Sequence, residues 1–479
     1  MKTNILAILV LLFVSACAMA QGNARLVFAG EVNVGNNYNI KTQHPIDADR
    51  LFVNVKDELQ SGDAAFATLG TVLIDVDAAP NKVNQIGNHK LIRVSEDYAS
   101  TLSKSGFTVM NLANSHVADF GIEGIQTTSW SMRDNGIEYA GLKSLKEYTT
   151  FERDGLKYGF VAFGTSVHSP QMSDSTMIRK IVTGLDGQCD IVVVAFSFNE
   201  TASSAAKGGI FAAGHQMYMD NARTFAHTCI NAGADVVYGN GHNMPQPLEL
   251  YRDRLIIYGL GNFCTPYGVT FSGETSAAPL LEANFFADGT FIGGRIHSFR
   301  QRNAQGPQND PSHEAAKIIK SQTLHQFPKT ELTIADDGTV TSTSESDYAL
   351  AMRLLKEAER HKGRPYVMGA SGPRAFDCSG FTSYVFARMG IKLKRSSAEQ
   401  YTMGTAVERK NLRPGDLVFF SRASVKGVGH VGIVYSVDKK TGSFKFIHAS
   451  SSRGVTIDNF ATSAYYVHRY IGAKRIIGN

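Results

Sequence analysis

The pentapeptide Phe376-Asp377-Cys378-Ser379-Gly380 decides how the last third of this 479-residue chain is interpreted. It opens a segment of helical character, residues 378–389, which Gly390 closes. A cysteine in the first turn of a helix lies at the positive end of the helix dipole, where N–H groups without intrahelical partners point toward it. This position is expected to lower the pKa of the thiol and to favour the nucleophilic thiolate. The sequence therefore predicts a reactive Cys378.

Two histidines follow at positions where a base could reach this cysteine. His430 begins a predicted strand over residues 430–435, and His448 ends a predicted strand over residues 444–448. Neighbouring antiparallel strands lie about 4.8 Å apart, so both imidazoles can stand beside the start of the helix. A buried structural cysteine with two surface histidines would have the same spacing. The reactive interpretation makes Cys378, His430 and His448 the candidate catalytic residues.

The surrounding segments place these residues in a separate domain. A helix is predicted from Asp347 to about His361, and further strands are predicted at residues 417–420 and 454–457. Helices followed by strands are typical of a compact α+β unit. Residues 300–311 and 336–346 are polar stretches rich in Gly, Pro, Ser and Asp, and we place the domain boundary near Ser346.

Five motifs in this segment occur in the order of a known family. They are Arg364-Pro365-Tyr366-Val367-Met368-Gly369, Asp377-Cys378-Ser379-Gly380, Arg395-Ser396-Ser397 with Gln400, Leu412–Phe420, and His430-Val431-Gly432-Ile433-Val434-Tyr435. Residues 347–477 thus resemble the NlpC-type cysteine peptidases of bacterial cell-wall hydrolases. The resemblance implies a papain-like fold and cleavage of the γ-D-glutamyl–diamino-acid bond in peptidoglycan stem peptides.

The same resemblance implies a role for each matching residue. Cys378 is the nucleophile, His430 the general base, and His448 the polar residue that orients His430. Three further residues are implied to lie at the substrate: Tyr366, Asp377 and Ser379.

The first two thirds of the chain have a different pattern, in which short apolar runs alternate with amphipathic stretches that end in Gly or Asn. The runs are residues 26–29, 64–69, 107–112, 158–163, 191–196, 235–238 and 255–258, and the helical stretches are 95–105, 121–135 and 216–232. Apolar strands separated by helices indicate a layered α/β domain.

Framework motifs in this region also follow the order of a known family. They are Phe28-Ala29-Gly30-Glu31, the stretch Asn111–His116, the stretch Gly233–Gly239, and the stretch Leu255–Phe263. About residues 25–300 resemble the CapA-like capsule-synthesis family, which is associated with poly-γ-glutamate. The resemblance implies a fold similar to calcineurin-type metallophosphatases for a domain of residues 25–345.

The positions of the metal ligands in that family are largely altered here. A di-metal site needs a dense set of carboxylate, His and Asn ligands. Thr68 and Gly70 replace an Asn and a Glu, and the residues that remain are Glu31, Asn114, His116, Glu200 and His242. We therefore predict no metal and no cofactor, and a domain kept for binding or positioning. The alternative is a one-metal site formed by Glu31, His116 and His242.

The amino terminus predicts export. A short positive segment, ten apolar residues at 5–14 and the small residues Ala18-Met19-Ala20 have the layout of a secretory signal peptide over residues 1–20. The stretch Val14-Ser15-Ala16-Cys17 also resembles a lipobox, so a lipoprotein anchored through Cys17 is the alternative. No later stretch is long and apolar enough for a transmembrane span. The expected location is periplasmic or extracellular.

Charge is divided unevenly along the chain. Residues 1–345 carry 26 Lys and Arg against 34 Asp and Glu, whereas residues 346–479 carry 22 against 9. The basic segment suits an anionic polymer that bears free carboxylates, and an exported protein is not expected to bind nucleic acid. We also expect the acidic domain to dock against the basic one.

Three functions agree with these observations. The first is an exported endopeptidase that acts on peptidoglycan stem peptides or muropeptides. The second is a poly-γ-glutamate hydrolase, which would use the same three catalytic residues on another polymer. The third is a non-catalytic polymer-binding protein.

Overall fold

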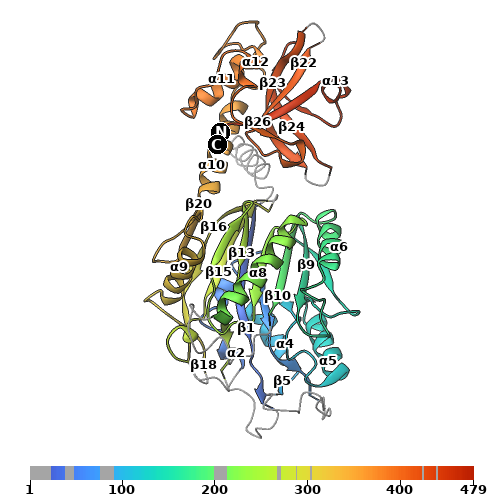
Figure 1. The fold of residues 1–479 in the computed structure, drawn as a ribbon, viewed down its shortest axis with the longest axis vertical. Coiled ribbons are helices and arrows are strands. Elements are labelled where there is room, and N and C mark those ends of the chain that lie inside the picture. Colours follow the sequence, from blue (N-terminus) through green and yellow to red (C-terminus); the bar gives the residue numbers. More distant parts are fainter. Residues whose placement is uncertain are drawn as a thin grey trace, which may run out of the picture. The chain divides into compact units, whose positions relative to one another are not determined.

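The computed structural model describes residues 23–37, 48–75, 91–198, 213–266, 271–286, 289–302, 305–422, 425–438 and 441–478 (Figure 1). The predicted signal peptide, Cys17 and Glu200 lie outside these residues. The chain forms two compact units, residues 1–342 and 343–479. No helix in the described ranges is long and apolar enough to cross a membrane.

The amino-terminal unit is built around two sheets. In spatial order the larger sheet contains β19 (Leu332–Ile334), β20 (Thr339–Ser342), β16 (Phe291–His297), β15 (Leu280–Phe286), β1 (Asn23–Val32), β3 (Ala64–Leu69), β6 (Val109–Asn111) and β7 (Glu138–Ala140), with β14 (Asn262–Cys264) beside β1. The second sheet contains β12 (Leu248–Tyr251), β13 (Arg254–Ile257), β11 (Val236–Asn240), β10 (Ile191–Ser197), β9 (Leu156–Gly164) and β8 (Tyr148–Arg153).

The two sheets bury their facing sides against each other. Phe28 and Phe66 of the larger sheet stack with centroids 5.2 Å apart, and Phe66 contacts Phe160 and Tyr238 of the second sheet. Because successive strand residues point to opposite faces, the alternate apolar residues form two outer cores. Helices cover these outer cores: α4 (Tyr98–Ser105) and α5 (Gly121–Asp134) on one side, and α6 (Ser175–Asp186) and α8 (Ala213–Asn231) on the other.

Shorter elements complete this unit. They are α2 (Ala48–Leu51), α3 (Lys56–Leu59), the small sheet of β2 (Asn36–Asn37), β5 (Ile92–Val94) and β4 (Val72–Leu73), the hairpin of β17 (Phe299–Arg302) and β18 (Gln305–Asn309), the 3-10 turn η3 (Gly273–Ser276), and α9 (Glu314–Gln326). Each apolar run expected from the sequence contributes to a strand, and the three expected helices are α4, α5 and α8.

Two polar stretches that we interpreted as loops contain regular structure. Residues 300–311 include part of the β17–β18 hairpin. In residues 336–346, β20 pairs with β16, and α10 (Thr343–Glu359) begins immediately after β20. The strand forms there because Val340 is buried between β-branched threonines that favour extended backbone.

The carboxyl-terminal unit is an antiparallel sheet with helical elements on both faces. The helical elements are α10, α11 (Cys378–Arg388), α12 (Ser397–Gln400), η4 (Arg409–Asn411) and α13 (Ala464–Val467). The sheet order is β21 (Thr405–Val407), β26 (Tyr470–Arg475), β22 (Leu417–Arg422), β23 (Val425–Asp438), β24 (Ser443–Ser450) and β25 (Gly454–Asn459). One core joins α10 and α11 to the sheet, and a second lies on the opposite face.

Candidate active site

Cys378 is the first residue of α11, and its neighbour Asp377 caps this helix. Asp377 Oδ1 accepts hydrogen bonds from the Gly380 N–H at 2.6 Å and from Arg395 Nη1 at 3.1 Å. Its Oδ2 accepts from the Gly369 N–H at 2.9 Å and from Arg395 Nη2 at 2.8 Å. These bonds fix the start of the helix and therefore the position of Cys378.

Two residues expected at the substrate are held in this capping network. Asp377 and Ser379 are both only 6% exposed, and Arg395 Nη1 donates to Ser379 Oγ at 3.1 Å. Burial disfavours the charged form of Asp377, but the hydrogen bond from Arg395 and the backbone N–H bonds outweigh it and hold the pKa of this carboxyl below its ordinary value. Asp377 thus carries a negative charge that the chain itself neutralises.

The thiol of Cys378 differs from the sequence expectation in its protonation. Cys378 is 5% exposed, and burial raises the pKa of the thiol above its ordinary value. The charge of Arg422 and the backbone N–H groups of Val431 and Ser379 act in the opposite direction without overcoming burial. The prediction of a lowered pKa was wrong, because it considered the helix start alone and the surrounding apolar core disfavours the thiolate.

Arg422 and Tyr366 lie together at the sulfur. Arg422 Nη2 is 3.9 Å from Cys378 Sγ and donates a 3.0 Å hydrogen bond to Tyr366 Oη. Tyr366 was expected near the thiol, whereas Arg422 was not predicted from the sequence. Its position at the end of β22 is 44 residues from Cys378 and depends on how the sheet packs against α11.

His430 and His448 lie inside β23 and β24 rather than at the strand ends that we predicted. Since Ile433 pairs with Ile447, the register places His448 opposite Gly432, and His430 is its diagonal neighbour on the same face. A Cβ atom at Gly432 would lie 2.7 Å from Phe446 Cδ2 and 3.1 Å from the Cβ atom of His448, so the glycine leaves room for both rings.

The second histidine contacts a carboxylate, that of Asp458, which was not predicted from the sequence. His430 Nε2 lies 2.9 Å from His448 Nδ1, and His448 Nε2 lies 3.0 Å from Asp458 Oδ2. Arg453 Nη2 donates to the same Asp458 oxygen at 2.6 Å. We call these four residues the histidine relay. Asp458 reaches His448 through the pairing of β24 with β25, which residue spacing does not reveal.

Burial and charge set the protonation of the relay. Burial, the largest cause, holds the pKa of His430 well below its ordinary value, and the charge of Arg422 and the competition of the adjacent His448 for a proton act in the same direction. Burial also lowers the pKa of His448, although Asp458 acts against this shift. Both imidazoles are therefore neutral near pH 7. Asp458 remains ionised because His448 and Arg453 outweigh burial and lower its pKa.

A neutral relay has one consistent assignment of protons. The Asp458 carboxylate only accepts, so His448 Nε2 carries the hydrogen and His448 Nδ1 the lone pair. His430 Nε2 must then donate to His448, which leaves the lone pair of His430 on Nδ1. The arrangement can therefore accept a proton at His430 Nδ1 and spread the resulting positive charge toward Asp458.

The amino-terminal unit has a neutral polar cluster where metal ligands were considered. The side chains come from the ends of parallel strands. Asn111 Nδ2 donates to Thr68 Oγ1 at 3.0 Å and to Ser197 Oγ at 3.1 Å, and Asn240 Nδ2 also donates to Thr68 Oγ1. These hydrogen bonds engage both amide nitrogens and leave Asn240 Oδ1 buried without a hydrogen-bond partner among the described residues, and the four side chains supply no carboxylate or imidazole.

Glu31 and His116 lie beside this cluster. A Cβ atom at Gly70 would lie 2.3 Å from Glu31 Oε1, so the glycine leaves room for the Glu31 side chain. Burial raises the pKa of Glu31, although His116 acts against it. His116 Nδ1 is 2.8 Å from Asp119 Oδ2, and this bond outweighs burial and raises the pKa of His116.

The third weak metal candidate, His242, does not complete a set with these two residues. Its Nδ1 accepts a hydrogen bond from the Met244 N–H at 3.3 Å, and its ring meets Tyr218 edge-on. Within the described part of the chain, no group of three or more His, Cys, Asp or Glu side chains is arranged to hold a metal ion.

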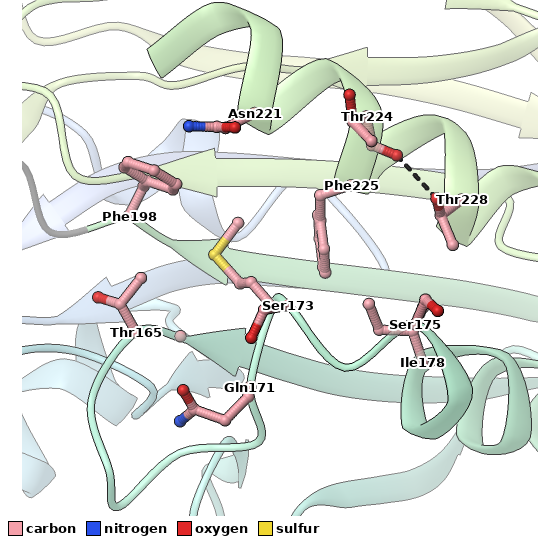
Figure 2. Close-up of a pocket in the computed structure, with 12 residues that line it drawn as sticks. Thr165, Gln171, Ser173, Ser175, Ile178, Phe198, Asn221, Thr224, Phe225 and Thr228 are labelled. Carbon is pink, nitrogen blue, oxygen red and sulfur yellow. Dashed lines mark hydrogen bonds between the residues drawn. The ribbon is translucent and has the colours of Figure 1, made fainter. Parts of the chain in front are cut away.

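A pocket of 420 Å³ lies between α6 and α8, at the carboxyl ends of β9 and β10 (Figure 2). Phe198 and Phe225 contribute aromatic surface, while Thr165, Gln171 and Asn221 contribute hydroxyl and amide groups. The described residues that line it include no charged side chain and no cysteine or histidine. The described lining offers hydroxyl groups, such as those of Ser173 and Ser175, without a histidine or carboxylate beside them to act as a base.

Comparisons with known proteins assign both units. The family model described as bacterial capsule synthesis protein PGA_cap matches residues 25–267, and the NlpC/P60 family model matches residues 363–475. The probable endopeptidase p60 of Listeria grayi is 46% identical over 118 residues, which cover 25% of this chain and 21% of that protein.

Two further relatives have different named activities. The gamma-DL-glutamyl hydrolase of Bacillus subtilis (strain 168) is 34% identical over 194 residues, 38% of this chain and 45% of that protein. The murein DD-endopeptidase MepS/murein LD-carboxypeptidase of Escherichia coli (strain K12) is 40% identical over 126 residues, 26% of this chain and 62% of that protein. The chain thus spans between about a fifth and three fifths of these relatives.

The two resemblances recognised in the sequence and the two-domain architecture are confirmed by these matches. The chain belongs to the PGA_cap family of bacterial capsule synthesis proteins through its amino-terminal unit, and its carboxyl-terminal unit is a cysteine peptidase domain of the NlpC/P60 family.

Proposed function

We propose that this protein is an exported cell-wall hydrolase that cleaves the γ-D-glutamyl–diamino-acid bond of peptidoglycan stem peptides. Cys378 is the nucleophile, His430 the general base, and His448 the residue that orients His430. The observation that carries the proposal is the histidine relay, which ends at Asp458 and leaves the lone pair of His430 on Nδ1.

The reaction follows from these protonation states. His430 Nδ1 takes the proton of Cys378, and the sulfur attacks the γ-carbonyl carbon to form a tetrahedral intermediate. Backbone N–H groups at the start of α11 stabilise the oxyanion. His430 then protonates the leaving amine, and water, activated by the same imidazole, hydrolyses the acyl-enzyme. Asp458 stabilises the imidazolium through His448 in both halves of the reaction.

Substrate contacts are proposed for Tyr366, Asp377 and Ser379. Asp377 already accepts four hydrogen bonds from Gly369, Gly380 and Arg395, so its main contribution is to hold the site in shape. An amine of the substrate could bind Asp377 only by sharing the carboxylate oxygens with these donors. The excess of Lys and Arg over Asp and Glu after residue 345 favours binding of a polymer with free carboxylates.

The amino-terminal unit is proposed to bind or position the polymer without a metal. We propose a metallophosphatase-like fold for this unit and a papain-like fold for the carboxyl-terminal unit, which performs the chemistry. The neutral hydrogen-bonded cluster of Thr68, Asn111, Ser197 and Asn240 supports loss of the metal centre, because amides and hydroxyls bind divalent cations more weakly than carboxylates do.

Product analysis by mass spectrometry tests the function. The mature chain is incubated separately with purified muropeptides and with poly-γ-glutamate. We expect muropeptides cut after γ-D-Glu, and no cleavage by Cys378→Ala. Cys189→Ala, which replaces a buried cysteine of the amino-terminal unit, is the matched control and should retain activity. Undiminished cleavage by Cys378→Ala would exclude the proposed nucleophile.

Hydrolysis of poly-γ-glutamate is the second candidate function. The match to the Bacillus subtilis gamma-DL-glutamyl hydrolase favours it, since that protein is named for a γ-glutamyl bond. It retains Cys378, His430 and His448 and changes only the polymer. Cleavage of poly-γ-glutamate with intact muropeptides would select this candidate, and absence of both products would favour a non-catalytic binding protein.

A further inference from the structure

A thiolate at Cys378 is stabilised by a positive charge nearby, and the surroundings limit which side chain can supply that charge. Burial makes the thiolate unfavourable, and the negative charge of Asp377 makes it more so. An imidazolium at His430 is disfavoured in the free protein, because burial and the neighbouring charges keep His430 neutral. The histidine therefore acts as a proton acceptor and does not supply a permanent cation.

Two guanidinium groups interact with Cys378, and they differ in their hydrogen-bond partners. Arg395 is bound to both oxygens of Asp377, so its charge is largely compensated by that carboxylate. Arg422 donates to the neutral hydroxyl of Tyr366, at 3.0 Å, and its Nη2 lies 3.9 Å from Sγ. Among the described residues, the titratable or charged side chains that interact with Cys378 or Arg422 are Asp377, Arg395, Tyr366, Tyr465, Tyr466 and His430.

We propose that Arg422 is a further catalytic residue of the peptidase unit, whose guanidinium pairs with the Cys378 thiolate, and that Tyr366 is the positioning residue that holds Arg422 there. This inference rests on the proposed nucleophile and adds a group that the sequence motifs did not identify.

The proposed step is balanced within the site. The S–H bond of Cys378 breaks and its proton passes to His430 Nδ1, which leaves a negative charge on sulfur and a positive charge on the imidazole. Arg422 gains no proton and loses none. It lowers the energy of the thiolate by direct charge interaction, and it also opposes retention of the proton by His430. The protonated His430 therefore donates its proton more easily to the leaving amine.

Tyr366 positions Arg422 through one hydrogen bond and through its own anchoring. Its hydroxyl accepts from Arg422 Nη2, and it donates to the sulfur of Met368 at 3.7 Å. Without the Tyr366 hydroxyl, the long and flexible arginine side chain can move away from Sγ. Loss of the hydroxyl should therefore weaken the effect of Arg422 without removing its charge.

Alkylation of Cys378 by iodoacetamide in the full chain tests this proposal, because the rate reports the thiolate and needs no substrate. The rate at Cys378 is followed against pH by mass spectrometry for the wild type, Arg422→Gln, Arg422→Lys and Tyr366→Phe. An opposite charge within about 4–6 Å lowers a pKa by roughly 1–3 units, so Arg422→Gln should slow alkylation near neutral pH about tenfold or more. The lysine and phenylalanine variants should have smaller shifts in the same direction.

The matched control is Arg388→Gln, at the opposite end of the helix that begins with Cys378. Arg388 lies 3.7 Å from Glu357, its side chain is 60% exposed, and the variant should titrate as the wild type. A pH profile of Arg422→Gln that superimposes on the wild-type profile would overturn the proposal. If that variant does not fold, unchanged profiles of both Arg422→Lys and Tyr366→Phe overturn it instead.

Two outcomes separate this inference from the proposed function. Slow alkylation of Arg422→Gln together with absent muropeptide cleavage by the wild type supports Arg422 and refutes the substrate. An increase in KM for muropeptides with unchanged alkylation would mean that Arg422 only binds substrate, which contradicts a role at the thiolate.

Discussion

Replacement of Asp458 tests how the relay supports the base. One oxygen, Oδ2, accepts from both His448 Nε2 and Arg453 Nη2. Asparagine can place its carbonyl oxygen at the same point, so Asp458→Asn preserves both bonds and removes only the negative charge. Asp458→Ala removes the acceptor as well. The two variants therefore separate charge stabilisation from control of the tautomer.

The distances give the size of the charge effect. The carboxylate lies 3.0 Å from His448 Nε2, and the two imidazole centroids are 5.0 Å apart. The positive charge on His430 thus forms roughly 8 Å from the carboxylate, where an effective dielectric constant of about 20 gives an attraction of about 2 kcal/mol. Loss of that attraction corresponds to about 30-fold in rate, which is our expectation for Asp458→Asn.

Asp458→Ala should be more damaging. With no acceptor at Nε2, His448 can carry its hydrogen on Nδ1 and donate to His430 Nε2, which moves the hydrogen of His430 to Nδ1. That tautomer cannot take the Cys378 proton. The loss should therefore approach the whole contribution of general base catalysis, about 10²–10⁴-fold.

The assay is kcat/KM on one defined muropeptide, with thermal unfolding of each variant as a check on folding. Asp438→Asn, at the far end of β23, is the matched control and should keep wild-type activity. If folded Asp458→Ala retains kcat/KM within about threefold of the wild type, the reasoning from the relay is wrong.

Three further predictions concern the frame of the site and the amino-terminal unit. Gly432→Ala places a Cβ atom 2.7 Å from Phe446 Cδ2 and 3.1 Å from the Cβ atom of His448, so we expect lower kcat/KM and a loss of about 1–3 kcal/mol in the free energy of denaturant unfolding. Because the pKa of Asp377 is lowered in the folded protein, its carboxylate stabilises the fold at pH values above the pKa of the unfolded carboxyl, and this contribution is lost as pH falls through the lower folded pKa. Arg395→Gln should therefore weaken the pH dependence of stability in acid unfolding curves. An unaltered pH dependence would contradict this prediction. Elemental analysis of the purified full chain should find no stoichiometric metal, and EDTA should leave muropeptide cleavage unchanged.

Local patterns were sufficient for much of the fold. The segment Ala64–Leu69 is a strand with the predicted bounds, because every residue is apolar or small and all are buried. The start of α11 was likewise predictable, since Asp377 is a good capping residue followed by small and apolar side chains. The antiparallel strands β15 and β16 were missed because their burial alternates and polar residues interrupt the apolar run.

Two residues of the candidate active site, Arg422 and Asp458, were not predicted from the sequence, and the reason is the same for both. Arg422 reaches the sulfur and Asp458 reaches His448 through strand pairing, so neither carries a signal in its own neighbourhood in the sequence. The wrong expectation for the thiol pKa has the same origin. The dipole of α11 is a local effect that the sequence predicts, whereas burial by distant strands is a tertiary effect of opposite sign.

Both proposed substrates present the same acyl group to this site, which explains how one set of residues agrees with two functions. In a stem peptide and in poly-γ-glutamate, the bond to be cleaved follows a γ-glutamyl carbonyl, so the proposed catalytic residues Cys378 and His430 and the N–H groups of α11 would meet the same atoms. The polymers differ in the leaving amine, which belongs to a diamino acid in one and to another glutamate in the other. The catalytic geometry therefore cannot select between them. Selection has to come from residues on the leaving-group side, where the second amine of a diamino acid distinguishes the stem peptide from poly-γ-glutamate.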